Sequence, residues 1–196
     1  MTSATDLERP RCFGGDDPLM IEYHDREWGR PVRDGRELFE HLTLDIFQAG
    51  LSWRVVLHKR QAMRRAFDDF DLVRIAEYGQ SDVDRLLADE GIIRNRSKIR
   101  ATINNAQAWL TFGSSGQDFS DFLWSFTGGQ VIRRPRVEEW SQLPTQSERS
   151  AAMAAGLKEN GFKFVGPTIC YAFMQAVGMV DDHLAACFKA QQPGGR

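Results

Sequence analysis

Long apolar runs are missing from this chain of 196 residues, although 42% of them are hydrophobic. It has no stretch of about 20 apolar residues, and the opening segment MTSATDLERP lacks the apolar run of a secretory signal. Cysteine is scarce: three residues, an odd number, argue against a disulfide framework and for a reducing compartment. We therefore expect a cytoplasmic protein with no membrane partner.

Other common patterns are missing as well. Alternating strand patterns are nearly absent and no repeats are evident, so the predicted fold class is all-α. The sequence contains no Gly-rich phosphate loop, Rossmann fingerprint or zinc-protease helix, which disfavours nucleotide-binding and peptidase functions. The length suits a single domain over residues 1–196, with flexible tails at 1–10 and 190–196.

A formal net charge of −2 gives no overall attraction to nucleic acid. Two local clusters of positive charge stand out, RNRSKIR at residues 94–100 and RRPR at residues 133–136. Either cluster can contact DNA, but a solvated helix end explains each of them about as well.

Helical patterns with short turns account for most of the chain. Ser81 and Asp84 resemble a capping box, and Ser97 can cap a longer helix. That longer helix is expected to turn four residues inward: Ile99, Ile103, Ala106 and Leu110. The predicted helices cover residues 36–47, 71–78, 81–90, 97–112, 120–126, 144–160 and 167–178.

The segment GFKFVGPT at residues 161–168 predicts a tight turn that leads into a helix. Proline suits the first helical position, and the free N–H groups of a helix start form an anion site. In a helix-hairpin-helix element such a turn grips a DNA phosphate without reading the base sequence. The alternative is a simple connection between two core helices. The candidate DNA contacts are Lys163, Val165, Gly166 and Thr168.

Histidine and cysteine occur in pairs near both ends of the chain. His183 and Cys187 are four residues apart, which on a helix places them on one face. Cys12 and His24 would complete a closed tetrahedral zinc site that joins the N- and C-terminal segments. Chance pairing is the alternative, because buried free cysteines are common; Cys170, in an apolar run, is expected in the core.

Three stretches together resemble the 3-methyladenine DNA glycosylase I family: DPLMIEYHDREWG at 17–29, QAGLSW at 48–53 and GFKFVGPTICYAFMQA at 161–176. The resemblance extends from about Cys12 to Cys187. It implies a helix-hairpin-helix glycosylase fold with a structural zinc held by two Cys and two His, which fall on Cys12, His24, His183 and Cys187.

The activity that this resemblance implies is base excision. Such an enzyme binds double-stranded DNA as a monomer, flips an alkylated purine, chiefly 3-methyladenine, into a pocket, and hydrolyses its N-glycosidic bond. Aromatic faces and a carboxylate favour the cationic base over neutral adenine. A non-catalytic DNA-binding module with the same zinc site is a rival hypothesis, and a zinc hydrolase is disfavoured because four ligands leave no open metal position.

The family's pocket aromatics correspond to Tyr23 and Trp53 here, and Phe13 is a third candidate that needs a one-residue gap. Core packing is the alternative role for these rings. Leu51 is expected to wedge into the space left by the flipped base. These assignments predict an aromatic pocket next to an intercalating loop.

The chain departs from the family at two acidic positions. The family's recognition acid is a glutamate three residues before the Gln-Ala-Gly motif, where this chain has Asp45. One lost methylene withdraws the carboxylate by about 1.5 Å, so lesion specificity can differ. Asp181 replaces the family's usual asparagine and is a candidate catalytic group. It can equally cap a helix that carries His183 or support the zinc site.

Bifunctional relatives use a lysine just after the hairpin glycine for a Schiff base, and Thr168 occupies the corresponding place here. Water, rather than an amine, is therefore the expected nucleophile. The sequence predicts a monofunctional enzyme without a lyase step.

Overall fold

A computed structural model of the protein describes residues 9–114 and 116–190. Its helices are α2 (Pro18–Arg26), α3 (Gly35–Gln48), α4 (Trp53–Ala66), α5 (Leu72–Ala76), α6 (Gln80–Ala88), α7 (Arg96–Gly113), α8 (Phe119–Ser125), α9 (Glu148–Glu159) and α10 (Pro167–Ala176). The 3-10 turns η1 (Asp68–Phe70) and η2 (Trp140–Gln142) and the strands β1 (Ile132–Arg133) and β2 (Val180–Asp181) complete the order. The tails expected at 1–10 and 190–196 lie almost entirely outside the described residues.

The fold is mostly helical, as predicted, but β1 and β2 form a small parallel pair that the sequence did not indicate. Ile132 aligns with Val180, and Arg133 aligns with Asp181. Strands of two residues are too short to show an alternating pattern, which explains why they were missed. Among the described helices, none combines the length and apolar character that crossing a bilayer requires.

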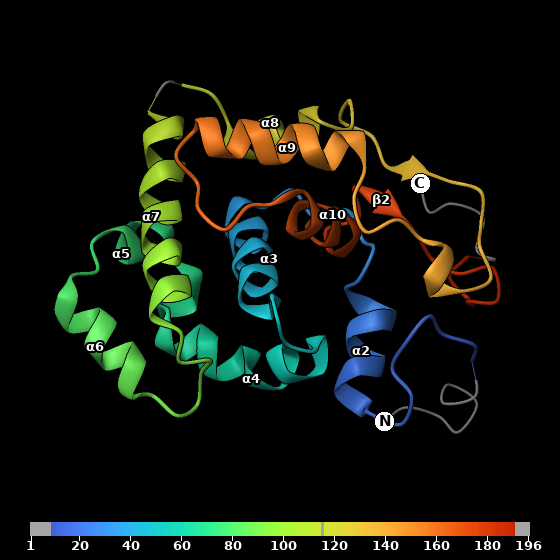
Figure 1. Ribbon diagram of the computed structural model, residues 1–196, viewed down its shortest axis with the longest axis horizontal. Helices are drawn as coiled ribbons and strands as arrows, with labels where there is room; N and C mark the ends of the chain where they lie inside the picture. The colour runs from blue at the N-terminus through green and yellow to red at the C-terminus, as the bar shows by residue number, and fades with distance from the viewer. Residues whose placement is uncertain (1–8, 115, 191–196) are drawn as a thin grey trace.

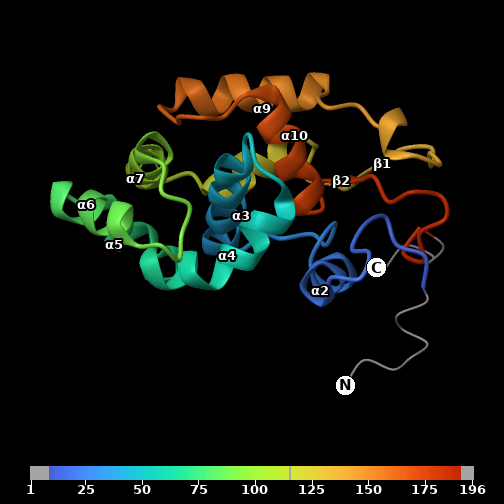
Figure 2. The ribbon, with the colours of Figure 1, turned by 60° about the horizontal axis from the view of Figure 1, so that its bottom comes forward.

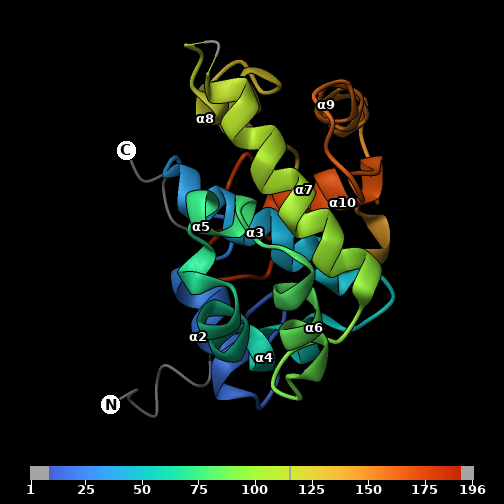
Figure 3. The same ribbon diagram turned by 90° about the vertical axis from the view of Figure 1, so that its left-hand side faces the viewer.

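Helix α3 occupies the centre of the molecule, with α7 on one side, α10 on the other, α9 above it and α4 below it (Figure 1). Every residue of α3 from Leu38 to Phe47 is buried. A helix that is surrounded on all sides must bury its polar residues too, and α3 buries both Glu40 and Asp45. Figure 3 shows α7 running diagonally across one face, with α9 seen end on. The central helix thus brings two acidic side chains into the interior.

Short polar side chains set where the helices begin. Asp34 accepts from the N–H groups of Arg36 and Glu37 and so starts α3, and Ser147 starts α9. Two predicted caps are wrong. The α6 box joins Gly79 to Asp82 rather than starting at Ser81. Asn95, rather than Ser97, caps α7.

One inward position of α7 also differs from the prediction. Leu110 is 37% exposed, whereas its neighbour Trp109 is buried at 8%. One helical turn of 3.6 residues after Ala106 ends between positions 109 and 110, so either residue can face the core. The indole takes the inward one, since it contacts the rings of Phe39 and Phe119 at centroid distances of 5.9 and 4.2 Å.

The two ends of the described chain lie side by side, as the blue and red segments on the right of Figure 2 show. The Phe188 N–H donates to the Pro10 carbonyl at 2.9 Å. The expectation that His183 and Cys187 share a helical face is wrong, because residues 182–184 have no regular structure after β2 and residues 185–190 form turns and a bend. The Cys187 N–H donates to the Leu184 carbonyl, and this turn, rather than a helix, aims the Cys187 side chain.

Candidate functional site

A cavity of about 190 Å³ lies beside the last turn of α3. The N-terminal segment, η2 and helices α2, α3, α4 and α10 contribute to its wall. It is lined by Phe13, Tyr23, Trp28, Asp45, Gln48, Trp53, Trp140, Ala172, Gln175 and Ala176. The structure therefore brings all four residues expected in a pocket, Phe13, Tyr23, Asp45 and Trp53, around one hollow.

Aromatic rings form most of the cavity wall. The Tyr23 and Trp53 ring centroids are 5.0 Å apart with an interplanar angle of 44°. Phe13 meets Trp28 edge to face at 5.2 Å, and Trp28 lies 5.8 Å from Trp140. Aromatic faces carry partial negative charge, so such a wall favours a flat ring of positive charge.

Asp45 is the acidic group of the cavity. It is 4% exposed, and its Oδ2 atom is buried with no hydrogen-bond partner among the described residues. Burial raises the pKa of Asp45 well above its ordinary value and, together with the Asp45 charge, also raises the pKa of Tyr23. An acid kept unpaired in this way is poised for a donor or cation that the protein itself does not supply.

The second buried acid of α3 shows the contrast. Glu40 accepts from the Arg60 guanidinium at 2.6 Å and from the Arg64 guanidinium at 2.8 Å. Although burial alone would raise it, these two arginines hold the pKa of Glu40 below its ordinary value. The fold therefore pairs one interior carboxylate and leaves the cavity carboxylate of Asp45 unpaired.

Sequence reasoning missed four polar or aromatic residues of the cavity wall. Trp28, Gln48 and Gln175 lie inside the three matched stretches, so the same signal that selected Tyr23 could have found them. Trp140 had no such signal. Its position depends on a hydrogen bond of 2.7 Å from its indole N–H to the carbonyl of Cys12, 128 residues away.

Three of the four expected metal ligands converge next to the cavity. The ligand atoms of Cys12, His24 and Cys187 lie within 4.8 Å of one another, and all three residues are buried, so the group can hold a metal ion. The His24 Nε2 atom is 3.4 Å from the Cys187 sulfur. The hydrogen bond between the two cysteines lowers the pKa of Cys187 and raises the pKa of Cys12, so Cys187 is the member of the pair that favours the thiolate form that binds metals.

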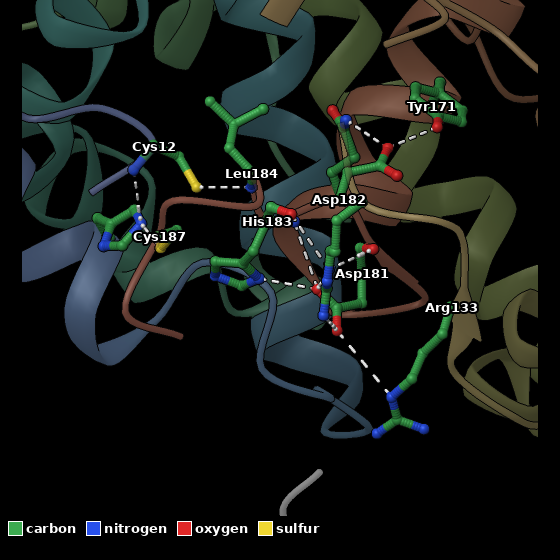
Figure 4. A network of polar contacts seen from close by, with 11 residues as sticks. Cys12, Arg133, Tyr171, Asp181, Asp182, His183, Leu184 and Cys187 are labelled. Carbon is green, nitrogen blue, oxygen red and sulfur yellow. Dashed lines mark hydrogen bonds and ion pairs between the residues drawn. The ribbon is translucent and has the colours of Figure 1, made fainter. Parts of the chain in front are cut away.

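His183, the fourth expected ligand, borders this cluster without belonging to the group of three. Its ring meets the His24 ring edge to face at 5.6 Å, and the neighbouring Leu184 N–H donates to the Cys12 sulfur (Figure 4). The His183 Nε2 atom is buried and unpartnered within the described part of the chain. A Cβ on Gly29 would lie only 2.7 Å from His183 Cε1. Glycine at position 29 is thus required by the histidine ring.

Asp181 faces the cluster and is not among the residues that line the cavity. It accepts from both terminal nitrogens of Arg136 at 2.7 Å and lies 2.9 Å from His183 Nδ1. Although burial alone would raise it, the Arg136 and His183 contacts hold the pKa of Asp181 far below its ordinary value. His24 has an equivalent partner, because Asp25 lies 2.8 Å from its Nδ1 atom. Both histidines therefore direct Nε2 inward.

The turn between α9 and α10 contains the segment for which the sequence predicted a hairpin. Lys163 and Thr168 are exposed on it, whereas the Val165 side chain is buried at 1%, so only the backbone of Val165 can meet a ligand. Phe164 has a φ of +59° and is 45% exposed, a position that the sequence did not single out. Gly166 precedes Pro167 at the start of α10 with an extended backbone, and a Cβ there would meet nothing within 4 Å.

The loop between α3 and α4 carries Leu51, which is 41% exposed. Lys98 of α7 holds this loop, because its ammonium group donates to the carbonyls of Phe47 and Ala49 at 2.8 and 2.7 Å. Lys98 is 6% exposed, so this cation of the 94–100 cluster supports the loop from inside. In the 133–136 cluster, Arg136 likewise bonds internally to Asp181.

Comparison with known proteins places this architecture in a family. The model of the methyladenine glycosylase family matches residues 13–190. DNA-3-methyladenine glycosylase 1 of Escherichia coli strain K12 is 49% identical over 181 residues, which cover 90% of this chain and 95% of that protein. A crystal structure of 3-methyladenine DNA glycosylase I is 50% identical with a TM-score of 0.88 and covers 91% of this chain and 98% of that one.

A further solved structure carries a ligand. It is a tyrosine-to-phenylalanine variant of 3-methyladenine DNA glycosylase I in complex with 3-methyladenine. It is 35% identical with a TM-score of 0.87, and the match covers 92% of this chain and 97% of that one. The fold and these relatives define a helical hydrolase that acts on N-glycosyl bonds. The chain belongs to the methyladenine glycosylase family.

Proposed function

We propose that this protein is a base-excision repair glycosylase that removes alkylated purines, chiefly 3-methyladenine, from double-stranded DNA. The observation that carries the proposal is the unpartnered carboxylate of Asp45 inside an aromatic cavity. A purine methylated at N3 and still joined to its sugar is a cation, so it is attracted both by the ring faces and by this acid. Neutral adenine gains less from either contact.

The reaction needs little force from the protein. The electron pair of the glycosidic bond moves onto the departing base and neutralises its positive charge, while water adds to the sugar carbon and loses a proton. Asp45 would hold the base in the cavity through its exocyclic amine and balance its charge. Because aspartate replaces the family's glutamate, the base must sit deeper or meet a bridging water, and lesion preference is expected to differ accordingly.

We assign Asp181 a positioning role rather than a chemical one. Its contacts with Arg136 and with His183 Nδ1 leave it facing the metal-ligand cluster. Single-turnover excision rates of Asp181→Asn and of the parent protein decide the matter. If both proteins are loaded with metal and their rates are equal, Asp181 has a positioning role. A rate that is several hundredfold lower in Asp181→Asn would show that Asp181 takes part in catalysis.

We further propose that the enzyme is monofunctional. Thr168 stands where bifunctional relatives use lysine, and its hydroxyl does not form a Schiff base. Borohydride added during turnover should trap no covalent protein–DNA adduct. A trapped adduct would contradict the proposal.

The metal that suits the ligand set is zinc. Two thiolates and two imidazoles form a closed structural site, and the buried, unpartnered Nε2 atom of His183 fits the role of fourth ligand beside Cys12, His24 and Cys187. A bound zinc ion would join the terminal segments and take no part in hydrolysis. Asp25 and Asp181 would orient the two histidines through their Nδ1 atoms.

DNA is expected to meet the hairpin and the Leu51 loop together. The backbone of Val165 and Gly166 with the exposed Thr168 would bind a phosphate as a helix-hairpin-helix element, and Lys163 would add positive charge. Leu51 would enter the base stack in place of the flipped nucleotide. We expect the chain to act as a single domain over residues 1–196 and as a monomer.

The experiment that tests the function is analysis of bases released from methylated duplex DNA. The parent protein should release 3-methyladenine, and Asp45→Asn should release it on the order of tenfold more slowly or worse, because a charged hydrogen bond is lost. DNA binding without any base release would instead support a non-catalytic binding module. Full activity of Asp45→Asn would remove Asp45 from recognition.

A further inference from the structure

A second polar group reaches the cavity from α10. Gln175 lines the hollow, and its Nε2 atom donates to Asp182 Oδ2 at 2.9 Å. The same carboxylate oxygen accepts from the Tyr171 hydroxyl at 2.5 Å, as Figure 4 shows, and the Arg134 guanidinium donates to that hydroxyl at 2.9 Å. A chain of hydrogen bonds therefore runs from Arg134 to the cavity wall.

This chain fixes which end of the Gln175 amide faces Asp182. A carboxylate accepts hydrogen bonds and donates none, so the amide must turn its nitrogen toward it. Asp182 is 3% exposed and Tyr171 is 2% exposed, so solvent does not compete for these contacts. The amide is planar and rigid; with its nitrogen engaged, its carbonyl oxygen Oε1 is the acceptor left for a ligand in the cavity.

We propose that Gln175 is a specificity-determining residue that presents this acceptor to the base, and that Asp182 is the positioning residue that fixes its orientation. The inference rests on the proposed function. The exocyclic amine of an alkylated adenine has two N–H groups, and Asp45 alone satisfies one of them. Gln175 supplies an acceptor for a donor-bearing base and disfavours a base with a carbonyl at the same position.

The network has features of a binding device rather than of packing alone. Asp182 Oδ1 is buried without a partner among the residues that the structure describes. A core that needed only stability would not keep a half-satisfied carboxylate against a tyrosine. The arrangement gives an orientation of Gln175 that an isolated glutamine on a cavity wall would not hold.

The test measures binding of three free bases to the full chain by quenching of tryptophan fluorescence, since Trp28, Trp53 and Trp140 line the cavity. The bases are 3-methyladenine, 3-methylpurine, which lacks the exocyclic amine, and 3-methylhypoxanthine, which has a carbonyl in its place. For Gln175→Met we expect affinity for 3-methyladenine to fall about tenfold and affinity for 3-methylpurine to stay unchanged.

Asp182→Asn tests whether Asp182 orients Gln175. The measured quantity is the preference between two bases, which a loss of stability alone would not change. An asparagine can donate to Gln175 as well as accept from it, so the amide can turn over and offer its N–H groups to the cavity. We expect the preference for 3-methyladenine over 3-methylhypoxanthine to fall at least fivefold, while Gln107→Met, whose amide bonds to Ala76 far from the cavity, keeps the parental preference. Tyr171→Phe should show a smaller change in the same direction.

The outcomes distinguish a failure of the proposed function from a failure of the Gln175 inference. If the parent protein binds none of the bases, the proposed function fails and this inference fails with it. If the parent binds 3-methyladenine and both Gln175→Met and Asp182→Asn keep its discrimination, the inference alone is overturned. Should Asp182→Asn fail to fold, the comparison of 3-methyladenine with 3-methylpurine on Gln175→Met decides.

Discussion

The side-chain amide of Asn105 forms two hydrogen bonds with the main chain of Lys163, one as donor and one as acceptor. Its amide nitrogen donates to the Lys163 carbonyl at 3.1 Å, and its amide oxygen accepts from the Lys163 N–H at 2.8 Å. Asn105 is 1% exposed, and the adjacent Asn104 donates to the Gly161 carbonyl at 2.8 Å. Helix α7 therefore positions the hairpin with its middle turns, while Lys98 near its start supports the Leu51 loop.

Replacing Asn105 with alanine should weaken both the fold and DNA binding. Two part-buried backbone groups of Lys163 lose their partner, which costs about 1–3 kcal/mol of stability. The hairpin then loses its fixed shape, so affinity for undamaged duplex DNA should fall while affinity for free 3-methyladenine is kept. Urea unfolding and DNA titration measure the two effects. Asn104→Ala, which removes an exposed hydrogen bond to Gly161 and a longer one to Asn105 but leaves both Lys163 contacts in place, is the matched control, and equal losses in both variants would contradict this assignment.

Gly166→Ala separates packing from ligand contact. Its φ of −80° suits alanine, and a Cβ would meet no protein atom within 4 Å, so stability should stay level or rise by about 0.4–1 kcal/mol. A phosphate lying against this backbone would be pushed away. We expect weaker DNA binding and a salt dependence reduced by about one phosphate contact.

Gly79→Ala is the control for that experiment. Gly79 also precedes a helix with an extended backbone and open space around it, but it lies before α6, away from the hairpin. Its DNA affinity should equal that of the parent. Unchanged DNA affinity in Gly166→Ala would show that no phosphate approaches the hairpin glycine.

Burial of Asp45 makes the stability of the folded protein depend on pH, and this stability should fall as pH rises. Since burial raises its pKa above the unfolded value, the folded state holds the proton over a pH range in which the unfolded state has lost it. The contribution of Asp45 to stability is then present below the unfolded pKa and is lost as pH rises through the folded pKa. Asp45→Asn should therefore gain melting temperature relative to the parent, and gain more at pH 8 than at pH 5.

The excision rate should rise with pH, whereas the Asp45 contribution to stability falls. The ionised carboxylate attracts the cationic base, so single-turnover excision by the parent should rise with pH through the raised pKa of Asp45. Asp45→Asn should be slow and lack this rise. Calorimetric melting and rates on methylated DNA at matched pH values measure both effects, and a parental rate that falls across this range would overturn the role of the ionised acid.

Gly29→Ala should loosen the proposed metal site. A positive φ of +76° costs an alanine roughly 1–2 kcal/mol, and its Cβ would also press on the His183 ring. Gly15→Ala is the matched control, because Gly15 has a φ of +56° with nothing within 4 Å of a Cβ. We expect a chromogenic chelator to remove zinc faster from Gly29→Ala than from Gly15→Ala. Identical release would mean that His183 does not hold the metal.

The sequence predicted the pocket through its matched stretches. Tyr23, Trp53 and Asp45 lie inside or beside ordered motifs, and the structure brings them around one cavity. Trp140 was missed because tertiary contacts bring it there, namely its hydrogen bond to Cys12 and its ring contacts with Phe13 and Trp28. Position in the fold, rather than local pattern, decides whether such a residue lines a site.

Local geometry was harder to predict than helical content. The spacing of His183 and Cys187 suggested a helical face, but the parallel pair of Val180 with Ile132 draws the chain into an extended course just before them. Tertiary pairing overrode a spacing argument at this point. At the start of α7 the deciding contact is local: Asn95, rather than Ser97, caps the helix, because its side-chain oxygen accepts from the N–H of Lys98.

The hydrogen bond between Trp140 and Cys12, and the contact of Cys12 with Cys187, have a consequence for how the enzyme matures. A growing polypeptide on the ribosome can bury α3 before residues 183–187 emerge, yet Cys12 cannot contact Cys187 until that segment has been made. Trp140, which lines part of the cavity, depends on its hydrogen bond to Cys12 for its position. Catalytic competence should consequently arrive only after residues 183–187 have been synthesised, and a single proteolytic cut after residue 182 should abolish activity while α3 stays folded.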